Sequence, residues 1–176
     1  MANTPIEQQF TLAMHYYNMR RYDVAEKYLS DLLAQEPHNN KYLFYYACTL
    51  LSQNKDKQRF TEIFESMFAD KTYGFISRIL LAEHYCDRIS IAYRMANLQS
   101  TQKGGQFNPF LDFIKWRLKM KKRKELRQKV KPLIDDAAGL NPSNILVFTK
   151  NAEYFRAYEQ YRKAKQFIAK AEQINH

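Results

Sequence analysis

The chain has 176 residues with only four Gly and five Pro, which excludes a β-sandwich with a turn about every 8–12 residues. Its formal net charge is +10, but ten basic residues and one acid fall between Lys115 and Lys131, so the rest of the chain is close to neutral. No stretch approaches the roughly 18 apolar residues of a membrane helix, and the first residues lack the pattern of a signal peptide. We therefore expect a helical, cytoplasmic protein whose two cysteines, Cys48 and Cys86, stay reduced.

The first helix is predicted to begin at Pro5, with Thr4 as its cap. Phe10, Met14 and Tyr17 form an apolar line on this helix in addition to the stripe that packing on one neighbour requires. We expect this extra line to contact a second helix or a ligand.

The second helix follows a break in the pattern at residues 18–21. Asp23 with Glu26 predicts its N-terminal cap, and Pro37 ends it. The two segments together predict a helical hairpin.

This hairpin resembles the tetratricopeptide repeat, a helix-turn-helix unit of about 34 residues with small and aromatic side chains at fixed positions. The matching residues are Leu12, Ala13, Tyr16, Tyr22, Ala25, Leu29 and Pro37. The same spacing returns near the C-terminus, where Ala152, Phe155, Tyr161, Ala164, Ile168 and Ala171 match Ala13, Tyr16, Tyr22, Ala25, Leu29 and Leu32. The offset from Ala13 to Ala152 corresponds to four periods of about 34 residues with a small insertion, which implies about five units.

The resemblance implies an all-α fold, a right-handed α-solenoid of stacked helix-turn-helix repeats in a single domain. Its units are expected at about 6–39, 40–73, 74–107, 111–144 and 145–176, with residues 100–108 as a mobile loop. The third unit is expected to turn at Asp87-Arg88. In the fourth unit, Pro132 predicts a second helix that is kinked or begins late.

Residues for catalysis are not grouped in this sequence. The four histidines, His15, His38, His84 and His176, have no Cys, Asp or Glu partner at metal-binding spacing. Neither a phosphate-binding Gly-rich loop nor a nucleophile motif occurs. We expect a protein that is not an enzyme and that binds no metal and no cofactor.

In tetratricopeptide proteins the first helix of each unit lines a concave groove that holds a partner peptide. The resemblance therefore implies a peptide groove formed by Phe10, Met14, Tyr17, Phe44, Tyr45, Cys48 and Leu51. These apolar and aromatic residues suit the hydrophobic side chains of a partner segment. Relatives that clamp a C-terminal carboxylate carry Lys and Asn where this chain has Phe10 and Met14, so that subtype is not expected. Packing against a neighbouring helix or a second copy of the chain remains an alternative.

The basic segment is the second candidate site. It comprises Lys115, Arg117, Lys119, Lys121, Lys122, Arg123, Lys124, Arg127, Lys129 and Lys131, with Trp116 among them. Such a segment can neutralise phosphates of a nucleic acid, contact an acidic protein surface, or be a solvated helical face without a partner.

Two functional hypotheses follow from the sequence. The first is an adaptor or chaperone-like module that binds a hydrophobic peptide of a partner protein in the groove. The alternative is a protein that binds nucleic acid or another polyanion through residues 115–131.

Overall fold

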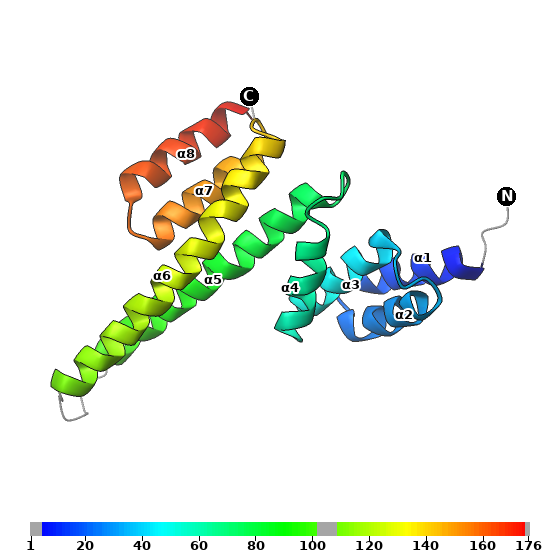
Figure 1. The fold of residues 1–176 in the computed structure, drawn as a ribbon, viewed down its shortest axis with the longest axis horizontal. Coiled ribbons are helices and arrows are strands. Elements are labelled where there is room, and N and C mark those ends of the chain that lie inside the picture. The colour runs from blue at the N-terminus through cyan, green and yellow to red at the C-terminus, as the bar shows by residue number, and fades with distance from the viewer. Residues whose placement is uncertain (1–4, 102–108, 175–176) are drawn as a thin grey trace. The chain divides into compact units, whose positions relative to one another are not determined.

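A computed structural model of the chain describes the backbone of residues 5–101 and 109–174 and the side chains of residues 5–87 and 120–174. All regular structure in these residues is α-helical (Figure 1), which confirms the predicted fold class. The helices are α1 (Pro5–Asn18), α2 (Tyr22–Gln35), α3 (Asn40–Ser52), α4 (Lys57–Ser66), α5 (Gly74–Thr101), α6 (Pro109–Leu140), α7 (Ile145–Ala157) and α8 (Tyr161–Ile174). The chain divides into two compact units, Met1–Ser77 and Arg78–His176.

Three hairpins close with the same turn. Its central residue lies in the left-handed region and is Arg20 (φ 59°), Asn54 (φ 53°) or Glu159 (φ 60°). After α1, the Arg21 amide donates to the Tyr16 carbonyl at 2.9 Å, and after α7 the equivalent Gln160 amide donates to Phe155 at 2.9 Å. These bonds satisfy carbonyls at the end of each helix. The repeat inferred from side-chain spacing is therefore present in the backbone.

The starts of the hairpins are also alike. Asn39 caps α3 by accepting from the Lys41 amide at 3.0 Å, and Asn144 caps α7 by accepting from the Leu146 amide at 2.9 Å. The predicted cap of α2 is wrong, because Arg21 is the N-cap residue and no side chain caps this helix. The predicted cap Thr4 lies outside the described residues.

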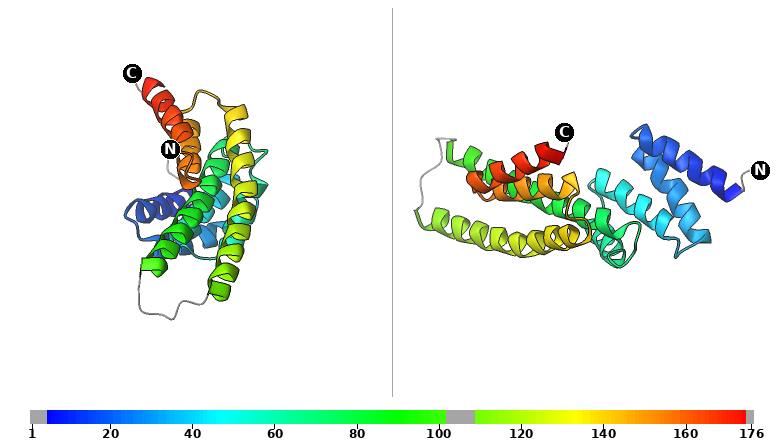
Figure 2. Two further views of the ribbon diagram at one scale, coloured as in Figure 1. Left: turned by 90° about the vertical axis from the view of Figure 1, so that its left-hand side faces the viewer. Right: turned by 90° about the horizontal axis from the view of Figure 1, so that it is seen from above.

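In the first unit, α1 packs on α2, α2 on α3, and α3 on α4 (Figure 2). Ala13 and Ala25 are fully buried, because small side chains let α1 and α2 approach closely. Ala13 forms a cluster with Leu29, Leu32 and Tyr42 that joins these two helices to α3. Burial of this cluster holds the helical hairpins of the first unit together.

The middle of the chain departs from the expected hairpins. The turn predicted at Asp87-Arg88 is wrong, because α5 is a continuous helix of 28 residues. The predicted late start of the second helix is also wrong, because α6 continues through Pro132 over 32 residues, whereas the predicted kink at this residue stays a prediction. Neither Asp nor Arg stops a helix by itself. The free energy that one exposed proline costs is smaller than the stabilisation that the rest of a long, packed helix provides.

In the second unit α6 packs on α7 and α7 packs on α8. The fully buried residues Val130, Ile134 and Ala137 of α6 and the buried Tyr154 of α7 belong to the core of this unit. Residues 100–101 of the predicted mobile loop belong to α5, and the other residues of that loop, 102–108, lie outside the described part.

Candidate peptide-binding surface

Aromatic side chains connect α1 to α3 in the first unit. The Phe10 ring lies 5.3 Å from the Tyr42 ring and 5.6 Å from the Tyr45 ring, measured between ring centroids. The Tyr17 ring lies 6.3 Å from the Tyr45 ring. These distances fall in the range where aromatic pairs attract each other, so the line on α1 packs on α3.

The predicted groove residues fall into two classes by exposure. Phe44 and Cys48 are buried, at 8% and 7% exposure. Phe44 packs on Phe64 and stacks on Tyr73 at 4.6 Å, so it supports the surface from within. Burial raises the pKa of the Cys48 thiol to about 12, which keeps it neutral and unreactive at physiological pH.

The other five groove residues are half-buried and so reach the surface of the first unit. They are Phe10, Met14, Tyr17, Tyr45 and Leu51. The Lys41 ammonium lies 4.1 Å from the centre of the Phe10 ring, a cation–π contact that the sequence analysis did not predict. The surface thus combines apolar and aromatic groups with a positive charge at one end.

The basic segment is only partly free for binding. Lys121, Lys122 and Lys124 are exposed on α6, whereas Lys131 forms an ion pair with Asp135. The Lys129 ammonium lies 5.5 Å from the centre of the Tyr85 ring of α5. The side chains of Lys115, Arg117 and Lys119, and that of Trp116, lie outside the described residues.

Two arginines of this segment anchor α6 to α7. The Arg127 Nε donates to the Tyr154 hydroxyl at 3.0 Å. The Arg123 guanidinium donates to the Ala157 carbonyl at 3.1 Å, and the Tyr158 hydroxyl donates to the Arg123 carbonyl at 3.0 Å. Burial raises the pKa of Tyr158, so this phenol remains a donor at physiological pH. Periodicity alone could not predict these contacts, because they join residues that are distant in the sequence.

The sequence patterns did not predict a buried lysine, Lys150 of α7. The Lys150 Nζ lies 2.9 Å from Glu153 and 3.3 Å from Glu83, and its side chain is 8% exposed. Burial by itself would lower the pKa of Lys150, but the hydrogen bond and charge of Glu153, together with Glu83, raise it. This charged group links α5 to α7.

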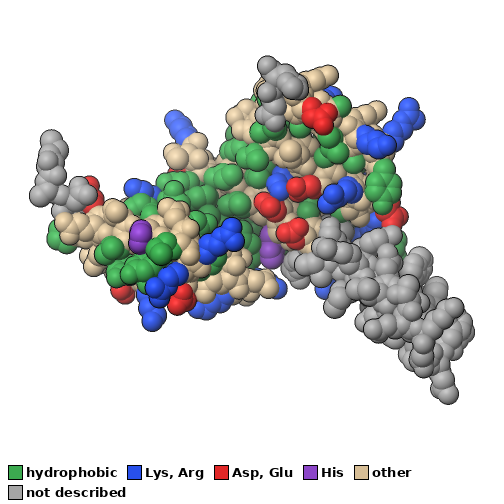
Figure 3. Space-filling view, turned by 180° about the vertical axis from the view of Figure 1, so that it is seen from behind, with side chains coloured by type: hydrophobic (Ala, Val, Ile, Leu, Met, Phe, Trp, Pro, Cys, Tyr) green, Lys and Arg blue, Asp and Glu red, His purple; other side chains and the backbone are tan. Residues whose placement is uncertain are grey.

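Hydrophobic side chains reach the surface beside charged ones on the face drawn in Figure 3. The large exposed ones include Leu12 and Met19 in the first unit, and Leu146, Tyr161 and Ile168 in the second. Among the described side chains, no group of three His, Cys, Asp or Glu residues could hold a metal ion. No helix in the described part is long and apolar enough to cross a membrane.

Comparison with one solved structure supports this architecture. The structure of TTC0263, a thermophilic tetratricopeptide-repeat protein of Thermus thermophilus, superposes with a TM-score of 0.65 over 96% of this chain and 74% of that one, at 15% identity. The fold is that of a tetratricopeptide-repeat solenoid. The structure of the MamA protein aligns with a TM-score of 0.41, 12% identity, and 96% and 91% of the two chains. Neither a family model nor a curated protein sequence matches the chain.

Within this tetratricopeptide-type fold, α1 and α3 are the first helices of their hairpins. The candidate surface therefore lies on helices of the class that the resemblance assigned to a peptide groove. At 15% identity the likeness establishes the fold, and the function has to be argued from the side chains.

Proposed function

We propose that the chain is a non-enzymatic protein–protein interaction module, of the adaptor or chaperone type, that binds a hydrophobic peptide segment along α1 and α3. The observation that carries this proposal is the row of half-buried residues Phe10, Met14, Tyr17, Tyr45 and Leu51. Aromatic groups on a rigid scaffold bury a large area at little cost in side-chain entropy. The two buried free cysteines suit a reducing compartment such as the cytoplasm.

The proposed groove is supported from within by the buried ring of Phe44. This ring stacks on half-buried Tyr73 and contacts Tyr45, so Tyr45 has a fixed support. Tyr45 contacts Phe10, Tyr17 and Phe44 and therefore joins both helices of the surface. A preformed surface of this kind binds without a large ordering cost.

Selection of peptides from a random display library on the full chain tests this function. Enriched sequences should carry at least two apolar side chains. Met14→Gln and Leu51→Gln should each weaken the binding of a selected peptide by about tenfold, because each removes apolar area from the surface without touching its ring contacts.

Leu12→Gln is the matched control, because Leu12 lies on α1, outside the proposed groove, and is 43% exposed. Its affinity for the peptide should stay within about twofold of the wild type. Equal affinities of all three variants, or a library without enriched apolar sequences, would refute the peptide groove.

A second candidate function is the binding of nucleic acid or another polyanion through α6. Lys121, Lys122 and Lys124 favour it, since all three are exposed within four consecutive residues. Such binding depends steeply on salt, because each neutralised phosphate releases counterions. A salt titration with single- and double-stranded nucleic acid tests this candidate.

A further inference from the structure

A groove on the last hairpin, α7 and α8, corresponds in sequence to the surface of α1 and α2 on which α3 packs in the first unit. We call that surface the seat of α3. In that unit α3 packs on α2, and the cluster beneath α3 includes Ala13, Leu29 and Leu32. Ala25 of α2 is buried as well. These four side chains are fully buried. Tyr42 of α3 belongs to the same cluster as Leu29 and Leu32.

The corresponding residues of the last hairpin form an open groove. When Ala152 is matched to Ala13, the residues that correspond to Ala25, Leu29 and Leu32 are Ala164, Ile168 and Ala171. These four residues of the last hairpin line a groove of about 340 Å³ between α7 and α8. Ile168 occupies the place of Leu29, yet it is 47% exposed where Leu29 is fully buried. The three alanines keep the floor flat enough for a helix to approach closely.

We propose that the groove between α7 and α8 is a docking site for an amphipathic helix of another protein, seated as α3 is seated on α1 and α2, with an acidic residue near its C-terminal end. This site lies apart from the proposed groove along α1 and α3. Its occupant is a helix, whereas that groove holds an apolar peptide segment.

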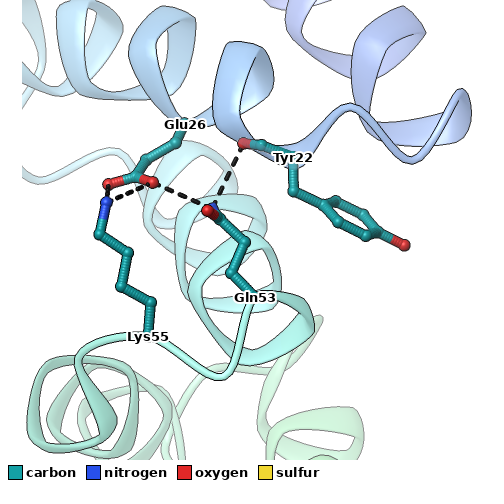
Figure 4. A network of polar contacts seen from close by, with 4 residues as sticks. All are labelled: Tyr22, Glu26, Gln53 and Lys55. Atoms are coloured by element: carbon teal, nitrogen blue, oxygen red, sulfur yellow. Dashed lines mark hydrogen bonds and ion pairs between the residues drawn. The ribbon is translucent and has the colours of Figure 1, made fainter.

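The charge at one end of the seat specifies the occupant. In the first unit Glu26 of α2 accepts hydrogen bonds from Lys55 at 2.7 Å and from Gln53 at 2.9 Å, and these bonds fix the C-terminal end of α3 (Figure 4). Lys165 stands at the place of Glu26 in the last hairpin and is exposed. The sign of the charge is therefore reversed, and the partner helix needs an acid where α3 is followed by Lys55.

A second positive charge reinforces this preference. Arg156 lines the groove and corresponds in sequence to Tyr17. Tyr17 interacts with Cys48 and Ser52, which lie in the C-terminal half of α3. Arg156 and Lys165 thus flank the same end of the seat. Glu153 and Glu172 also line the groove, but Glu153 is paired with Lys150 and Glu172 lies in the last turn of α8. The two cations at this end therefore favour a carboxylate on the partner and disfavour a lysine.

The same positions argue against a second copy of this chain as the occupant. If α1 of a second copy bound in the groove, it would take the place that α3 has in the first unit. Each of its residues would then correspond to a residue of the α3 segment, as Ala13 corresponds to Ala47. Arg21 then falls at the place of Lys55 and faces Lys165. Like charges at this contact oppose such stacking.

Two stapled helical peptides provide the probes for a test on the full chain. Both have the sequence of residues 39–55, one with Lys55 retained and one with Lys55→Glu. The peptide with Glu should bind about fivefold more tightly to the wild-type chain, as expected for an exposed pair of opposite charges. Lys165→Glu should reverse this preference, whereas Lys170→Glu, the same charge change more than one turn further along α8, should leave it unchanged.

Ile168→Asp should weaken the peptide with Glu at least tenfold, because it places a charge on the apolar floor. Retained binding in Ile168→Asp, or an unchanged preference in Lys165→Glu, would overturn the proposal. Sedimentation of the wild-type chain gives a further outcome. A dimer that dissociates in Ile168→Asp would make a second copy the occupant and would equally overturn the proposal.

Discussion

Glu26 shows how one side chain in this fold can hold two helices together. Its carboxylate is 17% exposed and is bound by Lys55 and Gln53. Burial alone would raise the pKa of Glu26, but the hydrogen bonds from Lys55 and Gln53 outweigh it and lower the pKa below the ordinary 4.5. The folded state therefore favours the ionised carboxylate.

Glu26→Gln should lower the free energy of unfolding by about 1 kcal/mol at pH 7, because it removes the ion pair and weakens two hydrogen bonds. Since the folded-state pKa is lowered, the stabilisation is complete above pH 4.5 and is lost as the pH falls through the lowered pKa. Urea denaturation of both proteins at several pH values should show their difference fading below about pH 4. Glu65→Gln, an exposed site on α4, is the control and should behave like the wild type at each pH.

At the scale of elements, the junction between α4 and α5 depends on a glycine. A Cβ atom added to Gly74 would lie 2.6 Å from the Phe68 carbonyl oxygen and 3.1 Å from the Met67 carbonyl oxygen. Both neighbours are backbone atoms, which cannot rotate away as a side chain can. The start of α5 therefore approaches the preceding chain more closely than any residue with a Cβ allows.

Gly74→Ala should lower the free energy of unfolding by about 1–3 kcal/mol, because the backbone must shift to admit a methyl group. Gly139 near the end of α6 is the matched site, since a Cβ there meets nothing within 4 Å. Gly139→Ala should instead raise the free energy of unfolding by about 0.5–1 kcal/mol. Thermal denaturation followed by circular dichroism measures both, and a stabilising Gly74→Ala would contradict the close approach.

At the scale of the whole molecule, charge is concentrated in one segment. Ten of the 28 basic residues lie between Lys115 and Lys131. Four of the seven described ones also contact other groups of the second unit, namely Arg123, Arg127, Lys129 and Lys131. A polyanion would therefore engage chiefly the exposed lysines at 121, 122 and 124.

Replacing Lys121, Lys122 and Lys124 together by Gln should reduce the salt dependence of duplex binding. The slope of log K against log salt should fall in magnitude by about 2–3, because each lost phosphate contact removes about 0.9. Lys27, Lys57 and Lys71 replaced together by Gln give the same change in net charge in the first unit. An equal effect of both triple variants, measured by fluorescence anisotropy, would mean that only net charge matters and would refute a site on α6.

The sequence by itself determined the helical class and the outer hairpins. Small residues such as Ala13 and Ala152 sit where helices must approach closely, and local spacing along the chain records that requirement directly. The turn at Arg20 and its counterpart at Glu159 are likewise local structures, closed by bonds between residues a few positions apart.

Only the tertiary structure decided features that depend on residues distant in the sequence. Local patterns could not show that α5 runs past Asp87 without a turn, since nothing in the local sequence forbids either outcome. Nor could they show that Phe44 is buried by Tyr73, or that Arg123 and Arg127 hold α7. The contrast between fully buried Leu29 and exposed Ile168 is of the same kind, because spacing records which residues face a neighbouring helix, while only the packed chain shows whether that neighbour is there.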